Sequence, residues 1–263
     1  MFVPLHDDTP LKVIRFQFVT IAIIAGNILV FLMTGAFQSE TMLAGVATSF
    51  GVVPSDLTTA FSQNIPYSPI PEPLTFLTYM FLHAGWLHLI SNMLFLWIFG
   101  NNVEDSMGRL RFLTFYLLVG LAAAASQVLV SPDSPVPMVG ASGAIGGVMG
   151  AYVMLYPRVA VDVWFPPVFR FVWPAWAMLG VWFFLDNLLP ASLTLGLERQ
   201  GGTAFWAHIG GFVAGILLVI PFPDPELVAQ GNHERIDLDD LDAGLRQVAM
   251  AELGEGASAQ AHH

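Results

Sequence analysis

Long apolar stretches separated by short polar segments dominate the chain. An α-helix needs about 20 apolar residues to cross the hydrocarbon core of a bilayer. Six stretches approach that length, near residues 14–36, 84–100, 110–130, 138–156, 171–190 and 204–222. The pattern therefore predicts an all-α fold, a polytopic membrane bundle of six transmembrane helices within residues 1–222.

The segment between the first two apolar stretches, about residues 37–83, is unusually long. It contains five prolines and apolar runs such as Met42–Val46. It is too long for a tight turn and too apolar for a plain solvated linker. We expect a long first outer loop that lies partly in the membrane interface.

Composition excludes several classes of protein. Hydrophobic residues make up 55% of the chain and charged residues only 11%, whereas soluble domains average about 25% charged residues. A two-domain soluble enzyme is therefore excluded. The chain has no cysteine, which removes disulfides, thiolate nucleophiles and cysteine metal sites.

Acidic residues are concentrated at the C-terminal end. Residues 222–263 contain nine acidic residues against two arginines, so we expect residues 223–263 to form an acidic cytosolic tail, flexible or with a short amphipathic helix at 236–251. His262 and His263 have no role that the sequence indicates. The chain has no basic patch, so we expect no nucleic-acid partner.

The nine lysines and arginines indicate the orientation. Eight of them lie on the cytoplasmic side if both termini are inside, and only Arg199 lies outside. This favours an N-in, C-in multi-pass protein of a bacterial-type plasma (inner) membrane. The N-terminus resembles neither a transit peptide nor a cleavable signal, so we expect the first apolar stretch to be retained.

Ionisable groups inside membrane spans are costly, which makes them functional candidates. Only three of the seven histidines, His83, His88 and His208, lie at or inside the apolar stretches. His88 and Asn92 are four residues apart, so both side chains lie on one helical face. We therefore expect two hydrogen-bond donors that point the same way.

Ser142 lies among glycines at the start of the fourth stretch. Free N–H groups and a positive helix end suit a nucleophile whose product is an oxyanion. The alternative is a small-residue packing face, because Gly143 and Gly147 form a GxxxG pair, as Gly211 and Gly215 do in the sixth stretch. The two interpretations are compatible: close helices would let Ser142 reach His208.

Depth in the membrane supports this grouping. His88, Ser142 and His208 lie four or five residues into the second, fourth and sixth stretches, which run in the same direction. At 1.5 Å per residue the three groups share a level ~6 to 8 Å below the outer boundary. Such an arrangement is what a Ser/His site open to the outer leaflet requires.

Three motifs carry a family resemblance. TYMFLHAGWLHLISNMLFLWIFGNNVEDSMG from Thr78, GASGAIGGVMGAY from Gly140 and AHIGGFVAG from Ala207 resemble, in the same order, the signatures of the rhomboid family of intramembrane serine proteases. The resemblance covers roughly residues 10–222. It implies Ser142 as nucleophile and His208 as general base and then general acid.

The resemblance also implies roles for further residues. His88 and Asn92, with the backbone N–H of Ser142, match the oxyanion-stabilising groups of the family. His83 matches a supporting histidine, and Glu104 and Arg109 match structural positions.

The sequence departs from the family pattern at two points. Where some relatives have an aromatic ring that packs against the catalytic histidine, this chain has Gly146. The orientation of His208 must therefore come from elsewhere. The first loop also has no arginine, so the Trp-Arg pair of some members is absent.

We expect neither a third member of the dyad nor a metal ion at the site. Asp186 and Asn187 lie near the outer end of the fifth stretch, but a dyad suffices in the family, and we interpret them as residues that meet the membrane interface. His83 and His88 have no adjacent carboxylate and no His-Glu-x-x-His pattern. We therefore expect no metal and no cofactor.

The leading hypothesis is an intramembrane serine endopeptidase that hydrolyses a peptide bond in or near the transmembrane segment of a membrane-protein substrate, close to the outer face. Its expected partners are transmembrane protein substrates and the lipid bilayer. The alternative is a catalytically inactive rhomboid-like protein that binds transmembrane segments. A transporter would need midplane charges and internal repeats, and the sequence has neither. The oligomeric state stays open.

Overall fold

The computed structural model describes residues 3–7, 14, 16–35, 39–63, 68–165, 169–193 and 204–223. The predicted acidic tail beyond Pro223 and the predicted outer-loop residue Arg199 lie outside the described residues.

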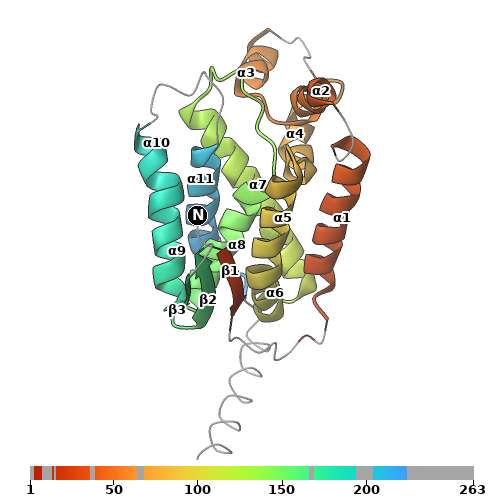
Figure 1. Ribbon diagram of the computed structural model, residues 1–263. Helices are drawn as coiled ribbons and strands as arrows, with labels where there is room; N and C mark the ends of the chain where they lie inside the picture. The colour runs from red at the N-terminus through yellow and green to blue at the C-terminus, as the bar shows by residue number, and fades with distance from the viewer. Residues whose placement is uncertain are drawn as a thin grey trace, which may run out of the picture.

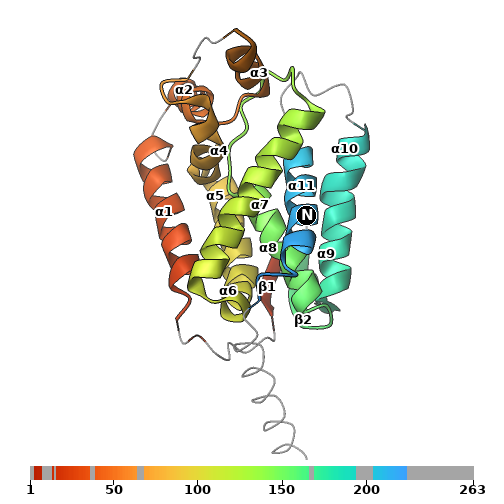
Figure 2. The same cartoon turned by 180° about the vertical axis from the view of Figure 1, so that it is seen from behind.

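Helices occupy each of the six predicted apolar stretches, and Figures 1 and 2 show them as an upright bundle. Four of the stretches contain one α-helix each: α1 (Phe18–Thr34), α7 (Arg109–Val130), α8 (Ser142–Leu155) and α11 (Phe205–Leu218). In the other two, the helices extend beyond the predicted ends at residues 100 and 190, and a π-helix separates two α-helices. The first series is α5 (Trp86–Phe95), η3 (Leu96–Gly100) and α6 (Asn101–Met107). The second is α9 (Ala175–Phe183), η4 (Phe184–Leu188) and α10 (Leu189–Leu193).

The bundle has the surface of a membrane protein. Among the described residues, two helical stretches, Arg109–Val130 and Ala175–Leu193, are individually long and apolar enough to cross a bilayer. A third candidate combines Glu72–Phe81 with Trp86–Met107, which are bent by 83°. Large apolar side chains point outward, including Leu87 and Leu129, which are 82% and 81% exposed. In water such a surface would be unfavourable, whereas lipid accommodates it.

The predicted outer loop is largely helical. It contains α2 (Glu40–Phe50), α3 (Pro54–Gln63), the 3₁₀ turns η1 (Glu72–Leu74) and η2 (Tyr79–Phe81), and α4 (Thr75–Thr78). Val52 and Met138 exchange two backbone hydrogen bonds of 3.1 and 2.8 Å. These bonds hold this segment against the chain that leads into α8.

The prediction of an all-α fold is wrong at the lower end of the bundle (Figure 1), where the chain forms a three-stranded antiparallel sheet. The strands, in the order β1-β2-β3, are Val3–Asp7, Ala160–Phe165 and Phe169–Pro174. β-Branched and aromatic residues dominate β2 and β3, as is typical of strands. The fifth helix consequently begins at Ala175, not at residue 171, because Pro174 suits the residue before a helix but cannot donate within one.

The sheet is attached to the bundle through a buried carboxylate at the end of β1. Asp7 accepts hydrogen bonds from the hydroxyl of Tyr152 on α8 and from Nδ2 of Asn102 on α6, the latter at 2.8 Å. Two donors to one carboxylate offset the cost of burying it. The N-terminal strand thereby joins two helices that are distant in sequence.

Glu104 accepts hydrogen bonds from the backbone N–H groups at the start of α1. Its side chain is fully buried and accepts hydrogen bonds from the backbone N–H groups of Val19 and Thr20, at 3.1 and 2.8 Å, and from the Thr20 hydroxyl at 2.7 Å. The first N–H groups of a helix have no partner within it, and a carboxylate also favours the positive helix end. Arg109 lies nearby, 4.6 Å from the centre of the Phe18 ring. Both residues therefore make structural contacts.

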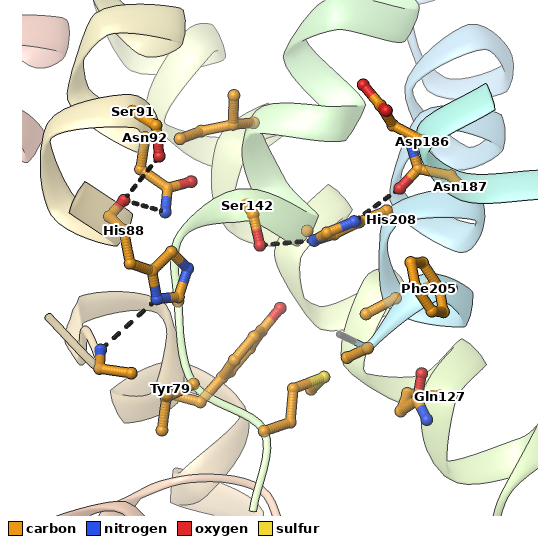
Figure 3. A pocket seen from close by; sticks show the side chains of 18 of the residues that line it. Tyr79, His88, Ser91, Asn92, Gln127, Ser142, Asp186, Asn187, Phe205 and His208 are labelled. Atoms are coloured by element: carbon orange, nitrogen blue, oxygen red, sulfur yellow. Dashed lines mark hydrogen bonds between the residues drawn. The ribbon is translucent and has the colours of Figure 1, made fainter. Parts of the chain in front are cut away.

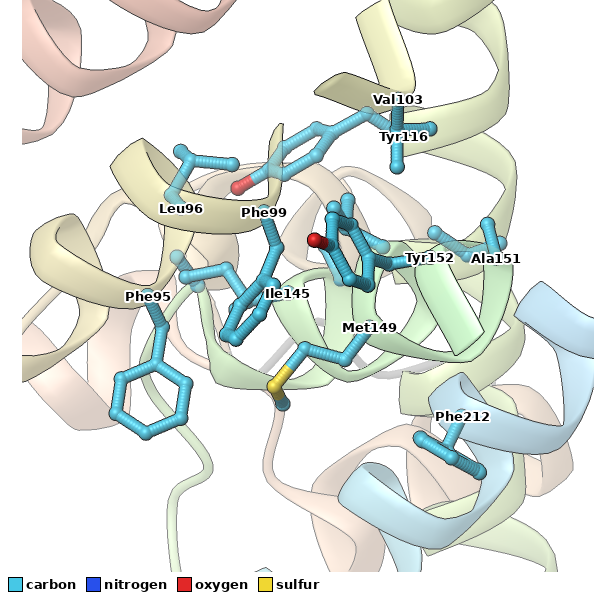
Figure 4. Packing of buried hydrophobic residues seen from close by; sticks show 14 of the residues in the cluster. Phe95, Leu96, Phe99, Val103, Tyr116, Ile145, Met149, Ala151, Tyr152 and Phe212 are labelled. Atoms are coloured by element: carbon cyan, nitrogen blue, oxygen red, sulfur yellow. The ribbon is translucent and has the colours of Figure 1, made fainter. Parts of the chain in front are cut away.

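The core lies around α8, which is buried along nearly its whole length. Figure 4 shows the aromatic and aliphatic side chains that α5, η3 and α8 bring together. The rings of Phe99 and Tyr152 meet edge to face with centroids 4.9 Å apart. This packing fixes α8 between its neighbours.

Glycines let α8 and α11 approach until their backbones touch. A Cβ atom on Gly211 would collide with the carbonyl of Gly143, and one on Gly215 would collide with the carbonyl of Gly147. On α8, a Cβ on Gly150 would likewise collide with the carbonyl of Phe212. Small residues at a helix contact allow this spacing. The close approach sets the separation between the first turns of the two helices, where Ser142 and His208 lie.

Candidate active site

Ser142 and His208 meet between α8 and α11. Ser142 Oγ lies 2.7 Å from Nε2 of His208, a hydrogen-bonding distance. Both side chains are half-buried and line one cavity (Figure 3). A hydroxyl held against an imidazole nitrogen has a base within reach of its proton.

The backbone conformation at Gly140, just before α8, brings the Ser142 hydroxyl close to the His88 ring. Gly140 has φ of +127°, a conformation that favours glycine. A Cβ at this position would lie 2.8 Å from Nε2 of His88 and 3.5 Å from Ser142 Oγ. Gly140 therefore allows the His88 ring and the serine hydroxyl to flank the same point. Ser142 begins α8, so its N–H belongs to the turn whose N–H groups have no intrahelical partner.

His88 and Asn92 lie on the cavity side of α5, as their spacing predicts. Nδ2 of Asn92 donates to the backbone carbonyl of His88 at 2.9 Å. Nδ1 of His88 accepts from the backbone N–H of Ala84 at 3.4 Å. The helix thus presents an imidazole and an amide to the cavity in which Ser142 lies.

His83 lies behind His88 and is only 4% exposed. The two imidazole rings meet edge to face with centroids 5.0 Å apart. Neither ring nitrogen of His83 has a hydrogen-bond partner among the described residues. The structure places His83 against the site but not among the residues that line the cavity.

Asn187 contacts His208 directly, and here the interpretation that Asn187 meets the membrane interface is wrong. Its Oδ1 lies 2.7 Å from Nδ1 of His208, and its side chain is 1% exposed. The sequence signal was available, because Asp186 and Asn187 interrupt an apolar span. Asp186 lines the same cavity but makes no described hydrogen bond to His208.

The π-helix η4 explains how Asn187 faces α11. Residues five apart diverge by about 140° on an α-helix but nearly align where the helix is π. Nδ2 of Asn187 donates to the backbone carbonyl of Trp182 at 3.3 Å, and the Trp182 ring lies 6.3 Å from the His208 ring between centroids. Trp182 and Asn187 therefore lie on the same side of the helix, against His208.

Gly146 also contacts His208. A Cβ on Gly146 would lie 3.2 Å from the backbone carbonyl of His208, so this position lies against the α11 backbone and leaves no room for a ring. The side chain of His208 instead contacts Asn187 and Trp182.

The cavity that joins these groups has a volume of about 870 Å³. Polar atoms converge in it from α5, α8, η4 and α11, and its wall is otherwise largely apolar, with Phe95, Met149 and Trp182 among the contacts. Gln127 and Tyr79 line it as well; the Tyr79 hydroxyl donates to the carbonyl of Gly120 at 2.7 Å. A concave apolar site with a few convergent polar groups is typical of a small-molecule or peptide site.

The fold and the cavity define a helical membrane protein in which a serine and a histidine from different helices meet. The family comparison agrees with the three sequence motifs: the Rhomboid domain matches residues 70–224, more than half of the chain. The chain belongs to the rhomboid family.

The relatives include mitochondrial, chloroplastic and bacterial proteins. The chain is 29% identical over 141 residues to Rhomboid protein 1, mitochondrial, of Saccharomyces cerevisiae, covering 52% of this chain and 38% of the relative. It is 40% identical over 89 residues to Rhomboid-like protein 11, chloroplastic, of Arabidopsis thaliana, covering 34% and 31%. It is 44% identical over 84 residues to Rhomboid protease GluP of Bacillus subtilis, covering 31% and 16%. The matches thus span well under half of each relative's own length.

Proposed function

We propose that this protein is an intramembrane serine endopeptidase that uses Ser142 and His208. The observation that carries the proposal is the 2.7 Å contact between Ser142 Oγ and His208 Nε2 inside the cavity. Membership of a family that includes a named protease supports it.

The reaction follows from the geometry. Ser142 Oγ attacks the carbonyl carbon of the scissile peptide bond while its proton passes to Nε2 of His208. The tetrahedral intermediate collapses, the C–N bond breaks, and the imidazolium returns the proton to the leaving amine. Water then attacks the acyl-serine with His208 as base, which releases a carboxylic acid and regenerates Ser142.

The negative oxygen of the intermediate needs donors that are already in place. The Ser142 N–H, the His88 ring and the second amide hydrogen of Asn92 are the proposed donors. In other serine proteases, removal of one such donor costs about 3 to 4 kcal/mol of transition-state stabilisation. The positive end of the α8 dipole acts in the same direction.

We propose transmembrane proteins as substrates and a site close to the outer face. A peptide bond within a stable helix is already hydrogen-bonded, so the substrate must unwind locally to enter the cavity. We also propose six spans with both termini on the cytoplasmic side of the membrane. The distribution of lysine and arginine supports this topology. Among bacterial, mitochondrial and chloroplast membranes, the relatives favour no single one.

The experiment that tests the activity is labelling of the purified protein with a fluorophosphonate probe, which reacts with activated serines. We expect the wild type to be labelled, and Ser142→Ala and His208→Ala to abolish labelling. Ser91→Ala is the matched control, because Ser91 lines the same cavity and its hydroxyl bonds only to the His88 carbonyl among the described residues. It should be labelled like the wild type.

Two results would count against the proposal. A folded wild type that is not labelled would favour the alternative, a catalytically inactive rhomboid-like protein that binds transmembrane segments. Labelling that survives Ser142→Ala would place the reactive group elsewhere. If labelling follows the expected pattern, mass spectrometry of a cleaved transmembrane substrate identifies the bond.

A further inference from the structure

We infer that Asn187 is a positioning residue that holds His208 in the tautomer required of a base, so that the site is a Ser-His-Asn triad in place of a dyad. This inference rests on the proposed function. It is carried by the contact of 2.7 Å between Asn187 Oδ1 and His208 Nδ1, on the side of the ring opposite Ser142. Figure 3 shows the three side chains in a line.

The orientation of the Asn187 amide follows from its second partner. Its other amide atom lies 3.3 Å from the backbone carbonyl of Trp182. A carbonyl only accepts hydrogen bonds, so the atom that faces it must be the NH₂ group. The oxygen of Asn187 therefore faces His208.

The tautomer of His208 follows in turn. An amide oxygen only accepts, so Nδ1 of His208 must carry a proton. A neutral imidazole has one proton, and Nε2 is then left with its lone pair directed at the Ser142 hydroxyl. That is the protonation state in which His208 can remove the serine proton. The opposite tautomer would place an N–H against the hydroxyl and block this step.

An amide suits this position better than a carboxylate does. Asn187 is buried at the level of the membrane spans, where an ionised group is costly. The amide orients the ring without adding charge, and it still stabilises the imidazolium through its oxygen. Serine and cysteine proteases of other folds use an aspartate or an asparagine in the same role.

Tight packing makes this orientation persistent. The η4 π-helix aligns Trp182 with Asn187, and both lie against α11. Ring rotation of His208 would break two hydrogen bonds, one on each side. Asn187 thus supplies the orientation that an aromatic ring at position 146 would otherwise give.

The test compares Asn187→Leu with a matched control, Asn27→Leu. Asn27 is also a fully buried asparagine whose Nδ2 donates to a carbonyl of its own helix, that of Ile23 at 2.8 Å, but it lies on α1 away from the site. Both variants lose an amide of the same size and burial. Only Asn187→Leu loses the contact to His208.

For a cleavable transmembrane substrate, we expect Asn187→Leu to lower kcat by about 10- to 100-fold with KM nearly unchanged, since loss of the corresponding carboxylate in a serine protease lowers kcat by up to about 10⁴-fold. Asn27→Leu should keep wild-type kcat. Asn187→Asp, which keeps an oxygen acceptor, should restore kcat to within about tenfold of wild type. Fluorophosphonate labelling rates should follow the same order.

A readout independent of activity is the ¹⁵N NMR spectrum of histidine side chains in the Ser142→Ala background, with His208→Gln used to identify the signals of His208. We expect His208 protonated at Nδ1, and a mixture of tautomers after Asn187→Leu. A His208 protonated at Nε2, or kcat of Asn187→Leu equal to that of Asn27→Leu, would overturn the inference. If the wild type neither labels nor cleaves, the proposed function fails instead, and the tautomer measurement still decides the role of Asn187.

Discussion

The contact between α8 and α11 makes a sharp prediction about Gly215. A Cβ on Gly215 would lie 2.7 Å from the Cα of Gly147 and closer still to its carbonyl, whereas ordinary contact begins at 3.4 Å. Gly215→Ala therefore forces α11 away from α8 by at least about 0.7 Å, the difference between these distances. The atoms that the new Cβ would meet belong to the backbone of Gly147, so no flexible side chain can move aside to make room.

The displacement should reach the candidate active site. Gly215 is seven residues beyond His208, ~10 Å along the helix. If α11 shifts as a unit, the contact between Ser142 Oγ and His208 Nε2 lengthens from 2.7 Å to about 3.4 Å, beyond the usual limit of about 3.2 Å for a hydrogen bond. We expect fluorophosphonate labelling of Gly215→Ala to slow at least about tenfold, a loss of ~1.4 kcal/mol in transition-state stabilisation.

Gly180→Ala is the control for helix propensity. Nothing lies within 4 Å of a Cβ at Gly180 on α9. The free energy of unfolding of this variant should therefore rise by the ~1 kcal/mol by which alanine stabilises a helix relative to glycine. Gly215→Ala is stabilised by the same helix-propensity difference, but overpacking against α8 destabilises it by about 1 to 3 kcal/mol. The difference in unfolding free energy between the two variants should therefore be about 1 to 3 kcal/mol, measured by denaturant unfolding in detergent. Equal unfolding and equal labelling of the two variants would refute the reasoning.

Two further predictions concern stability and topology. Glu104→Gln should lower the free energy of unfolding by about 1 to 3 kcal/mol, because an amide replaces the charged acceptor of the buried Thr20 hydroxyl and N–H groups; an unchanged unfolding midpoint would contradict this. The cysteine-free chain allows single cysteines at two exposed positions at opposite ends of the bundle, Asp133→Cys and Arg158→Cys. If both termini are cytoplasmic, a membrane-impermeant maleimide added outside intact cells should label only Asp133→Cys, and the reverse pattern would invert the proposed topology.

The positions of the helices and the α8–α11 contact were predictable from the sequence. The six apolar stretches that contain helices were visible as long apolar runs, and glycines at a spacing of four residues marked the faces that touch. Gly143 and Gly211 lie where this spacing places them, against each other's helix. Local sequence patterns were therefore enough to predict the helices and the contact between α8 and α11.

Features that depend on distant contacts were not predictable. The sheet pairs β1, at the start of the chain, with β2, more than 150 residues later, and short strands leave only a weak periodic signal. Asn187 was set aside because a dyad suffices in the family, and its contact with His208 depends on how the helix around Trp182 and Asn187 is wound. The π-helix that aligns them leaves no clear mark in composition.

The order of the site residues along the chain has a consequence for biosynthesis. Four successive parts of the polypeptide contribute to the site, through Asn92, Ser142, Asn187 and His208. His208 lies on the last helix that the structure describes. A nascent chain that has been synthesised only as far as η4 has Ser142 but not His208. If the proposed mechanism holds, Ser142 has no base until α11 packs against α8, so the order of synthesis would delay activation of the serine until the bundle is complete.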